Sequence, residues 1–247
     1  SFKKASIGTT NHMLESGITY TSVTTICNTF RWFPDGYLYD VSGPSMYCKD
    51  RTQVWNLLGM LNSKLYSKYA PVLNSTMCMQ IGDIKKLPVI LPDKSVDSMV
   101  KECIYLSQLD WDSTETSWDF AKHPLCFCTI STKKAFTYWQ KITEERFNKL
   151  KANEEELNRI FINIYGLKDE LTPEVGDKDI TIRKADLGRD IRSFISYAVG
   201  CMFGRYSLDV DGLIYAGGQW DDSKYSSFIP VKDNIIPITD EEYFEDD

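Results

Sequence analysis

The clearest hydrophobic pattern in the chain lies between residues 51 and 92. Apolar side chains recur there at three- and four-residue spacing, which predicts a helix over residues 51–69 with one buried face. That face carries Val54, Leu57, Leu58, Leu61 and Leu65. Lys64 and Lys68 fall outside this apolar stripe, so the helix has a basic edge that could face phosphate. A strand-like run ending in Lys-Lys-Leu-Pro follows the helix.

The two ends of this helix have recognisable signals. Asp50 can cap its start, with Gln53 as a capping-box partner three positions later. Pro71 disfavours the helical backbone at Ala70, which predicts that the helix ends near Tyr69.

Short strands joined by tight turns are predicted before residue 50, where Thr, Ser, Tyr and Ile are frequent. The two best strand candidates are residues 17–21 and residues 37–41. Turn signals occur at Asn11-His12, Pro34-Asp35-Gly36 and Gly43-Pro44. Three helices are predicted beyond residue 93, at 95–107, at 132–165 and near 189–203. The predicted apolar stripe of the last helix is Ile191, Phe194, Ile195, Ala198 and Met202.

The long segment 132–165 is predicted to form one helix, or two joined by a kink. Its stripe contains Phe147, Leu150, Leu157, Phe161 and Ile164, with Glu154 filling a gap. Gly166 is well placed to end it, and Gly200 and Gly204 are predicted close-packing or C-cap positions in the last helical segment. These patterns predict the α+β class: a small β-rich domain with packed helices, a long helical spacer and a further α/β segment.

Composition indicates a folded protein, because 43% of the 247 residues are apolar and 13% are aromatic. No stretch approaches 18 consecutive apolar residues, and the first residues lack the apolar core of a signal peptide. The chain has no initiator Met, which favours a fragment of a longer protein. Seven scattered cysteines predict reduced thiols and a cytoplasmic location.

The charge is unevenly distributed along the chain. The net charge is -7, yet residues 1–90 hold nine Lys and Arg against five Asp and Glu, and the remaining 157 hold 19 against 30. On charge alone, the first third is the part suited to a polyanion, although ordinary surface variation explains the same excess.

The sequence offers several candidate kinds of chemistry. His123, Cys126 and Cys128 offer soft metal ligands, or are packed thiols beside a surface histidine. Pro34-Asp35 with Asp83-Ile84-Lys85 resembles a magnesium nuclease pattern, although the first fits a turn better. No nucleophile elbow or Gly-rich phosphate loop is present. Trp111 and Trp118 lie among acidic residues that would repel phosphate, which favours a docking or domain-joining loop.

Three separated stretches carry a family resemblance: GMLNSKLYSKY with QIGDIKKLPV, then DWDSTETSWDFAKHPL, then EEELNRIFINIYGLKDELTPEV with SFISYAVGCMFGRYSLDVDGLIYAGG. They resemble the C-terminal half of the PglX family, the adenine-specific DNA methyltransferases of BREX phage-defence systems. The first stretch is also similar to target recognition domains of type I and type IIG restriction-modification proteins.

The resemblance implies a parent enzyme that uses S-adenosylmethionine to methylate the exocyclic amine of adenine. The family's catalytic tetrapeptide, Asn or Asp followed by Pro-Pro-Tyr, is absent because no two of the nine prolines are adjacent. The chain would therefore bind no cofactor and be inactive alone, leaving recognition of double-stranded DNA as its role. The domains expected are a target recognition domain at 1–93, a helical spacer with an acidic aromatic loop at 94–166, and an incomplete C-terminal segment with an acidic tail at 167–247.

Polar and basic residues near the predicted turns and helix are the candidate DNA contacts. They are Arg31, Trp32, Lys49, Arg51, Lys64, Lys68, Lys85 and Lys86. The expected partners are DNA, the N-terminal methyltransferase half and other BREX subunits, with no membrane. The alternative function is a protein-docking module that binds defence-complex subunits or an inhibitor without contacting DNA.

Overall fold

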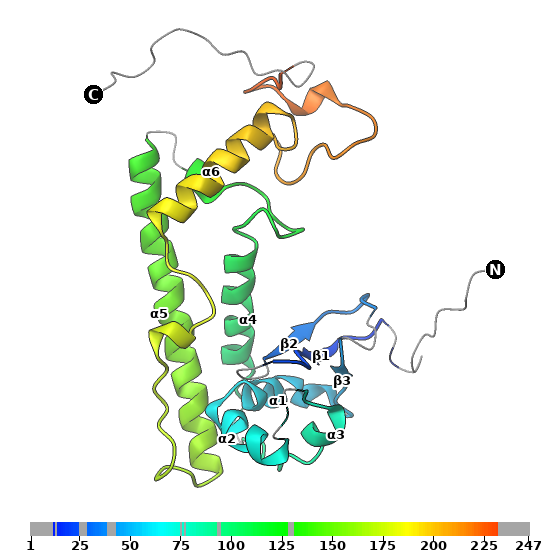
Figure 1. Cartoon of the computed structure of the whole chain (residues 1–247), viewed down its shortest axis with the longest axis vertical. Coiled ribbons are helices and arrows are strands. Elements are labelled where there is room, and N and C mark those ends of the chain that lie inside the picture. Colours follow the sequence, from blue (N-terminus) through cyan, green and yellow to red (C-terminus); the bar gives the residue numbers. More distant parts are fainter. Residues whose placement is uncertain are drawn as a thin grey trace, which may run out of the picture. The chain divides into compact units, whose positions relative to one another are not determined.

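The computed structural model describes residues 12, 14–24, 29–38, 43–74, 76, 78–92, 95–127 and 131–231 (Figure 1). Two compact units are present. Unit 1 contains residues 1–106 and 147–181, and unit 2 contains residues 107–146 and 182–247. Two helices, α4 (Asp97–Trp111) and α5 (Thr132–Ile164), each contribute to both units. The α+β class is confirmed.

Unit 1 contains an antiparallel sheet of three short strands in the order β2-β1-β3. They are β1 (Gly17–Tyr20), β2 (Phe30–Phe33) and β3 (Ser45–Met46), and Ile18 of β1 faces both Trp32 and Met46. The strand candidate at 17–21 is confirmed. The candidate at 37–41 is wrong for Tyr37 and Leu38, which lie in no strand, and its last three residues lie outside the described ranges.

The second strand lies instead just before the turn. Phe30 is buried and Arg31 is exposed, the alternation typical of a half-buried strand. The turn at Pro34-Asp35-Gly36 is confirmed, because Gly36 has a φ of 93° and its N–H donates to the carbonyl of Leu14 at 2.8 Å.

The single helix expected at 51–69 is two helices, which corrects that prediction. A 3-10 turn, η2 (Arg51–Gln53), leads into α1 (Val54–Leu61), and α2 (Lys64–Leu73) follows. Asp50 caps the start as expected, accepting the Thr52 N–H at 2.9 Å. The break occurs at Asn62, whose side-chain amide pairs with both the N–H and the carbonyl of Phe30 at 3.0 Å. The side chain therefore acts as a strand partner for β2.

Two further expectations about this segment are wrong. Pro71 lies inside α2, which continues to Leu73. The carbonyl that loses its partner belongs to Ser67, an exposed residue that water can reach, so the proline is tolerated. The strand-like run before Lys85 is a short helix, α3 (Ile81–Ile84), because the Asp83 carboxylate accepts the Gln80 N–H at 3.3 Å and caps it.

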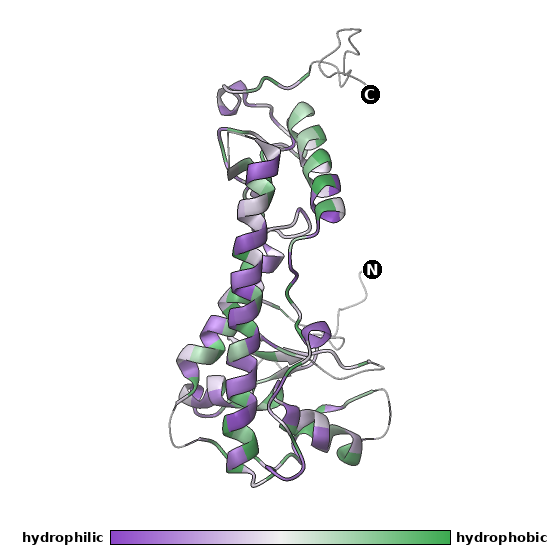
Figure 2. Ribbon diagram, turned by 90° about the vertical axis from the view of Figure 1, so that its left-hand side faces the viewer, coloured by the Kyte–Doolittle hydropathy of each residue, from purple (hydrophilic) through white to green (hydrophobic). Residues whose placement is uncertain are grey.

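The core of unit 1 is where α1, α4 and α5 meet. Gly59 permits the close approach, since a Cβ there would lie 3.0 Å from Val100 and 3.5 Å from both Leu157 and Phe161. The stripe predicted for 132–165 is confirmed as buried or partly buried positions, and the helix predicted at 95–107 is α4, which buries Val100 and Leu106. Figure 2 shows α5 as largely hydrophilic, with separate apolar positions along it. Gly166 ends this helix with a φ of 66°.

Unit 2 is organised by α6 (Leu187–Met202), which corresponds to the helix predicted at 189–203. Its buried face differs from the predicted stripe: Ile195 is 56% exposed, whereas Tyr197 is 1% exposed and Cys201 is buried. Tyr197 stacks on Tyr206 with ring centroids 5.0 Å apart, and Phe120 packs edge-on against both rings. Aromatic packing therefore decides which face of the helix is buried.

The rest of the described chain after α5 consists of loops and two 3-10 turns, η4 (Asp177–Asp179) in unit 1 and η5 (Asp222–Lys224) in unit 2. A further 3-10 turn, η3 (Pro124–Phe127), precedes α5. Within the described residues, no helix is long and apolar enough to cross a membrane.

Gly204 has a backbone conformation and a close neighbour that alanine could not accommodate without strain. Its φ is 74°, and a Cβ there would lie 2.4 Å from the Trp220 ring, which stacks on Tyr225 at 4.8 Å. We expect Gly204→Ala to lower the free energy of unfolding by roughly 2 kcal/mol, from backbone strain plus the clash. Gly217→Ala is the matched control, since Gly217 also has a positive φ but nothing lies within 4 Å of its Cβ position. Equal losses in urea denaturation would contradict the role given to Trp220.

Candidate nucleic-acid interface

Arg31 and Trp32 are neighbours on β2 and have different surroundings. Arg31 is exposed, and its Nη2 donates to the hydroxyl of Thr29 at 3.2 Å. Trp32 is partly buried and packs against Trp55 of α1, with ring centroids 5.5 Å apart. Trp32 is therefore anchored in the core, whereas the Arg31 guanidinium projects from the sheet.

A cation lies over the second tryptophan of this pair. The Lys101 Nζ is 5.0 Å from the centroid of the Trp55 ring, a cation–π geometry. Sequence reasoning missed both residues, because Lys101 comes from α4 and is separated from Trp55 by 46 positions. The fold thus joins Trp32, next to Arg31 on the half-buried strand β2, to the Trp55 ring and the Lys101 ammonium group.

Four of the predicted contact residues are engaged within unit 1. Arg51 pairs with Glu15 at 2.9 Å, Lys86 with Asp83 at 3.1 Å, and Lys68 with Glu170 at 2.9 Å. The Lys64 Nζ donates to the backbone carbonyl of Glu174 at 2.5 Å. Lys64 and Lys68 therefore tie α2 to the segment that follows α5.

Lys49 and Lys85 differ from these four. Both are exposed, and neither forms an ion pair with any residue that the structure describes, which also holds for Arg31. Of the eight predicted residues, one is therefore an aromatic residue packed against the core, four are cations that already bind acceptors within unit 1, and three are cations available to a ligand.

The tertiary structure also changes the charge pattern. Residues 147–181 contribute eight Asp and Glu but only five Lys and Arg to unit 1. As a result, unit 1 holds 16 basic and 16 acidic residues, and unit 2 holds 12 and 19. The excess of positive charge in the first third is therefore balanced within its own unit. Binding of a polyanion would depend on individual exposed cations rather than on a net positive charge of the unit.

The carboxylates of the nuclease alternative have structural roles. Asp35 Oδ1 accepts the Ser16 N–H at 2.6 Å, and this hydrogen bond lowers the pKa of Asp35. Asp83 accepts from Asn74 at 2.6 Å and pairs with Lys86, and these contacts lower its pKa. Asp35 therefore holds a turn, and Asp83 caps α3.

His123 is the histidine of the possible metal site. The sequence predicts either a metal ligand or a surface histidine beside packed thiols. His123 is only 3% exposed, so the expected surface position is wrong. Its Nδ1 accepts the Leu125 N–H at 3.2 Å, and burial lowers its pKa to about 4. Cys126 packs on an aromatic cluster, and Cys128 lies outside the described residues. Within the described ranges, no group of three or more potential ligands gathers.

The acidic aromatic loop after α4 presents one tryptophan fully to solvent. Trp118 is 101% exposed, and Trp111 is 57% exposed. Local hydrogen bonds hold the loop: the Ser117 hydroxyl donates to Asp112 at 2.6 Å, and the Asp119 N–H donates to Ser117 at 3.1 Å. This loop is therefore an ordered projection.

Comparison with known proteins finds relatives that are named as adenine-specific methyltransferases. No protein-family model matches it. It is 45% identical over 237 residues to the adenine-specific methyltransferase PglX of Lacticaseibacillus casei (strain Zhang), an alignment that covers 93% of this chain and 20% of that protein. It is 30% identical over 271 residues to the adenine-specific methyltransferase BrxX of Escherichia coli O9:H4 (strain HS), covering 99% and 22%. The chain spans about a fifth of the length of these relatives. Over nearly its whole length, the chain is therefore homologous to a segment of adenine-specific methyltransferases.

Proposed function

We propose that this chain is the DNA target recognition part of a site-specific adenine methyltransferase that acts in BREX phage defence. The observation that carries the proposal is the 45% identity to a protein named as an adenine-specific methyltransferase. In this proposal another part of the parent protein binds S-adenosylmethionine and carries the Asn/Asp-Pro-Pro-Tyr catalytic residues, which this sequence lacks. The parent acts in the cytoplasm on double-stranded DNA, together with other BREX subunits.

Within that role, we assign recognition to residues 1–93, and the geometry of unit 1 supports distinct tasks for its cations. Arg31 projects from a strand that Trp32 anchors in the core, so its guanidinium can present paired donors to a base edge or a phosphate. Lys49 and Lys85 suit phosphate contacts that set register. Lys64 and Lys68 stabilise the unit, because both already bind the segment after α5.

The salt dependence of binding tests this assignment. We expect the 247-residue chain to bind a mixed-sequence DNA duplex with an affinity that falls steeply as salt rises, because phosphate contacts release counterions. Replacing Arg31, Lys49 and Lys85 together with glutamine should reduce the slope of log K against log salt by roughly three, about 0.9 per contact. Fluorescence anisotropy at several salt concentrations measures both quantities.

The control for this experiment is Lys133→Gln, which removes an exposed lysine of unit 2. This variant should keep the wild-type slope. If the triple variant also keeps it while remaining folded by circular dichroism, the assignment of these three residues is wrong. If the wild type shows no salt-dependent binding, the recognition role itself fails for this chain.

One observation favours the second candidate, a protein-docking module. Trp118 is fully exposed on an ordered loop beside Asp112 and Asp119, which suits a partner with an apolar pocket and a basic rim. A docking module without phosphate contacts would give no salt slope with DNA, so the anisotropy experiment separates the two functions.

A further inference from the structure

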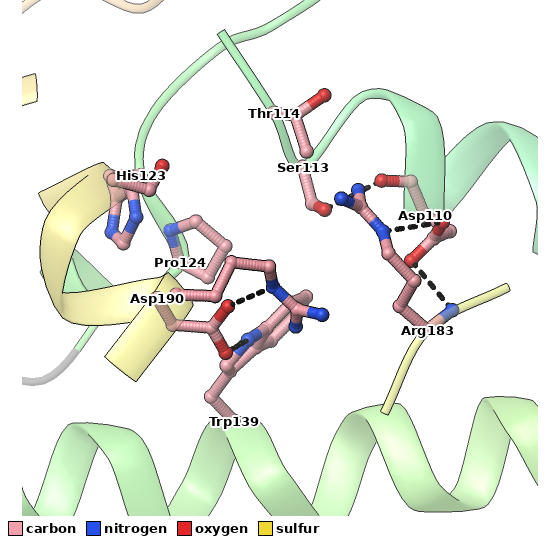
Figure 3. Close-up of a pocket in the computed structure, with 10 residues that line it drawn as sticks. Asp110, Ser113, Thr114, His123, Pro124, Trp139, Arg183 and Asp190 are labelled. Carbon is pink, nitrogen blue, oxygen red and sulfur yellow. Dashed lines mark hydrogen bonds and ion pairs between the residues drawn. The ribbon is translucent and has the colours of Figure 1, made fainter. Parts of the chain in front are cut away.

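Unit 2 contains a small pocket with polar walls, distinct from the residues assigned to DNA above. Its volume is about 70 Å³, well beyond the roughly 10–15 Å³ that one water molecule needs. Figure 3 shows His123, Pro124 and Asp190 on one side, and Ser113, Thr114 and Arg183 on the other. All of the residues that line it belong to unit 2.

The acidic groups of the pocket are already committed to protein partners. The buried Asp190 accepts the Trp139 Nε1–H at 3.2 Å, the Asp186 N–H at 3.0 Å and the Arg189 Nε–H at 2.8 Å. Asp110 accepts the Arg183 N–H at 3.3 Å and faces its Nε at 3.5 Å. Each carboxylate therefore neutralises and orients one arginine of the pocket.

The polar groups of the pocket that have no partner among the described residues are mainly hydrogen-bond donors. Both arginines are held through Nε, which leaves the terminal nitrogens of Arg183 and the Nη1 of Arg189 without a hydrogen-bond partner in the described part of the chain. Because the Nδ1 of His123 accepts a backbone N–H, its proton is on Nε2, a neutral donor at pH 7. Ser193, whose side chain carries a hydroxyl, also lines the pocket.

We propose that this pocket binds a phosphoryl group, held by the free guanidinium nitrogens of Arg183 and Arg189, the Nε2–H of His123 and the hydroxyl of Ser193. The wall of the pocket holds two arginines and two aspartates and therefore carries no net charge. Because the carboxylates already accept hydrogen bonds from the protein, the free donors would select an oxyanion through directed hydrogen bonds. Two sources share this chemistry: free phosphate and the phosphate backbone of DNA.

Titration of the 247-residue chain with inorganic phosphate tests the proposal, with sodium chloride used to hold the ionic strength constant. We expect saturable binding by calorimetry, and a saturable shift of the His123 Nε2–H signal by NMR that sodium chloride alone does not produce. Arg183→Gln should weaken phosphate binding by at least about tenfold, because it removes charge-assisted hydrogen bonds. Arg192→Gln, the control, removes an exposed arginine on α6 that does not line the pocket and should leave the affinity unchanged.

The outcomes separate the two sources. If DNA is the source, inorganic phosphate competes with a DNA duplex and Arg183→Gln weakens duplex binding. If free phosphate is the source, phosphate still binds, but neither added phosphate nor Arg183→Gln alters binding of the duplex. The proposal is overturned if phosphate produces no saturable shift at His123 in the wild type, a readout that does not depend on any variant folding. It is also overturned if folded Arg183→Gln binds phosphate as tightly as Arg192→Gln does.

Discussion

Replacing Phe161 with alanine should lower the free energy of unfolding by about 3–5 kcal/mol. Phe161 is 0% exposed, and its ring lies at the point where Gly59 brings α1 against α4 and α5. The smaller side chain would leave a cavity that neither Val100 nor Leu157 can fill without moving a helix. Urea denaturation followed by circular dichroism measures the loss.

Tyr105→Ala is the matched control for this substitution. It removes an aromatic side chain of similar size from α4, but the side chain is 59% exposed, so the change should stay within about 0.5 kcal/mol. A loss below about 1 kcal/mol for Phe161→Ala would show that the three-helix junction does not carry the core of unit 1.

Replacing Glu154 with glutamine should remove the destabilising contribution that this carboxyl makes as pH rises from about 4.5 to 7. His123, whose lowered pKa acts in the opposite direction over nearly the same range, is present in both proteins. Glu154 occupies a partly buried position in the stripe of α5, and desolvation raises the pKa of its carboxyl from 4.5 to about 7. A raised pKa means that the folded state holds a proton that the unfolded state releases. The Glu154 carboxyl by itself therefore makes unfolding easier as pH rises through this window, by about 3 kcal/mol.

The glutamine variant carries no ionisable group at this position, so its stability should exceed that of the wild type above pH 7 and approach it below pH 4.5. Chemical denaturation at a series of pH values from 4 to 8 measures the difference. Glu156→Gln changes a carboxylate on the same helix that pairs with Arg159 and whose side chain is 43% exposed, and this variant should keep the pH dependence of the wild type. Parallel curves for wild type and Glu154→Gln would contradict the burial of a protonated Glu154.

The elements whose stability depends on local signals could be predicted from the sequence. The stripes of α4 and α5 recur at helical spacing over many residues, Gly166 and Pro34-Asp35-Gly36 have backbone conformations that few other residues adopt, and β1 has the composition of a strand. The relation to adenine-specific methyltransferases was also recognisable from three stretches of sequence, and it is confirmed by the homologous proteins.

Tertiary contacts decided the remaining features. Asn62 breaks the predicted helix because its amide pairs with Phe30, which is 32 positions away, and α6 turns Tyr197 inward because Tyr206 and Phe120 are there to pack against. Neither partner can be read from local periodicity.

The same limit applied to the candidate site. The sequence alone determined which residues are basic, but only the fold decided which of them remain available. Lys64 and Lys68 are held by a segment about 100 residues away, whereas Arg31, Lys49 and Lys85 stay exposed. Residue type sets the charge of a side chain, and the three-dimensional neighbours determine whether that charge is already satisfied.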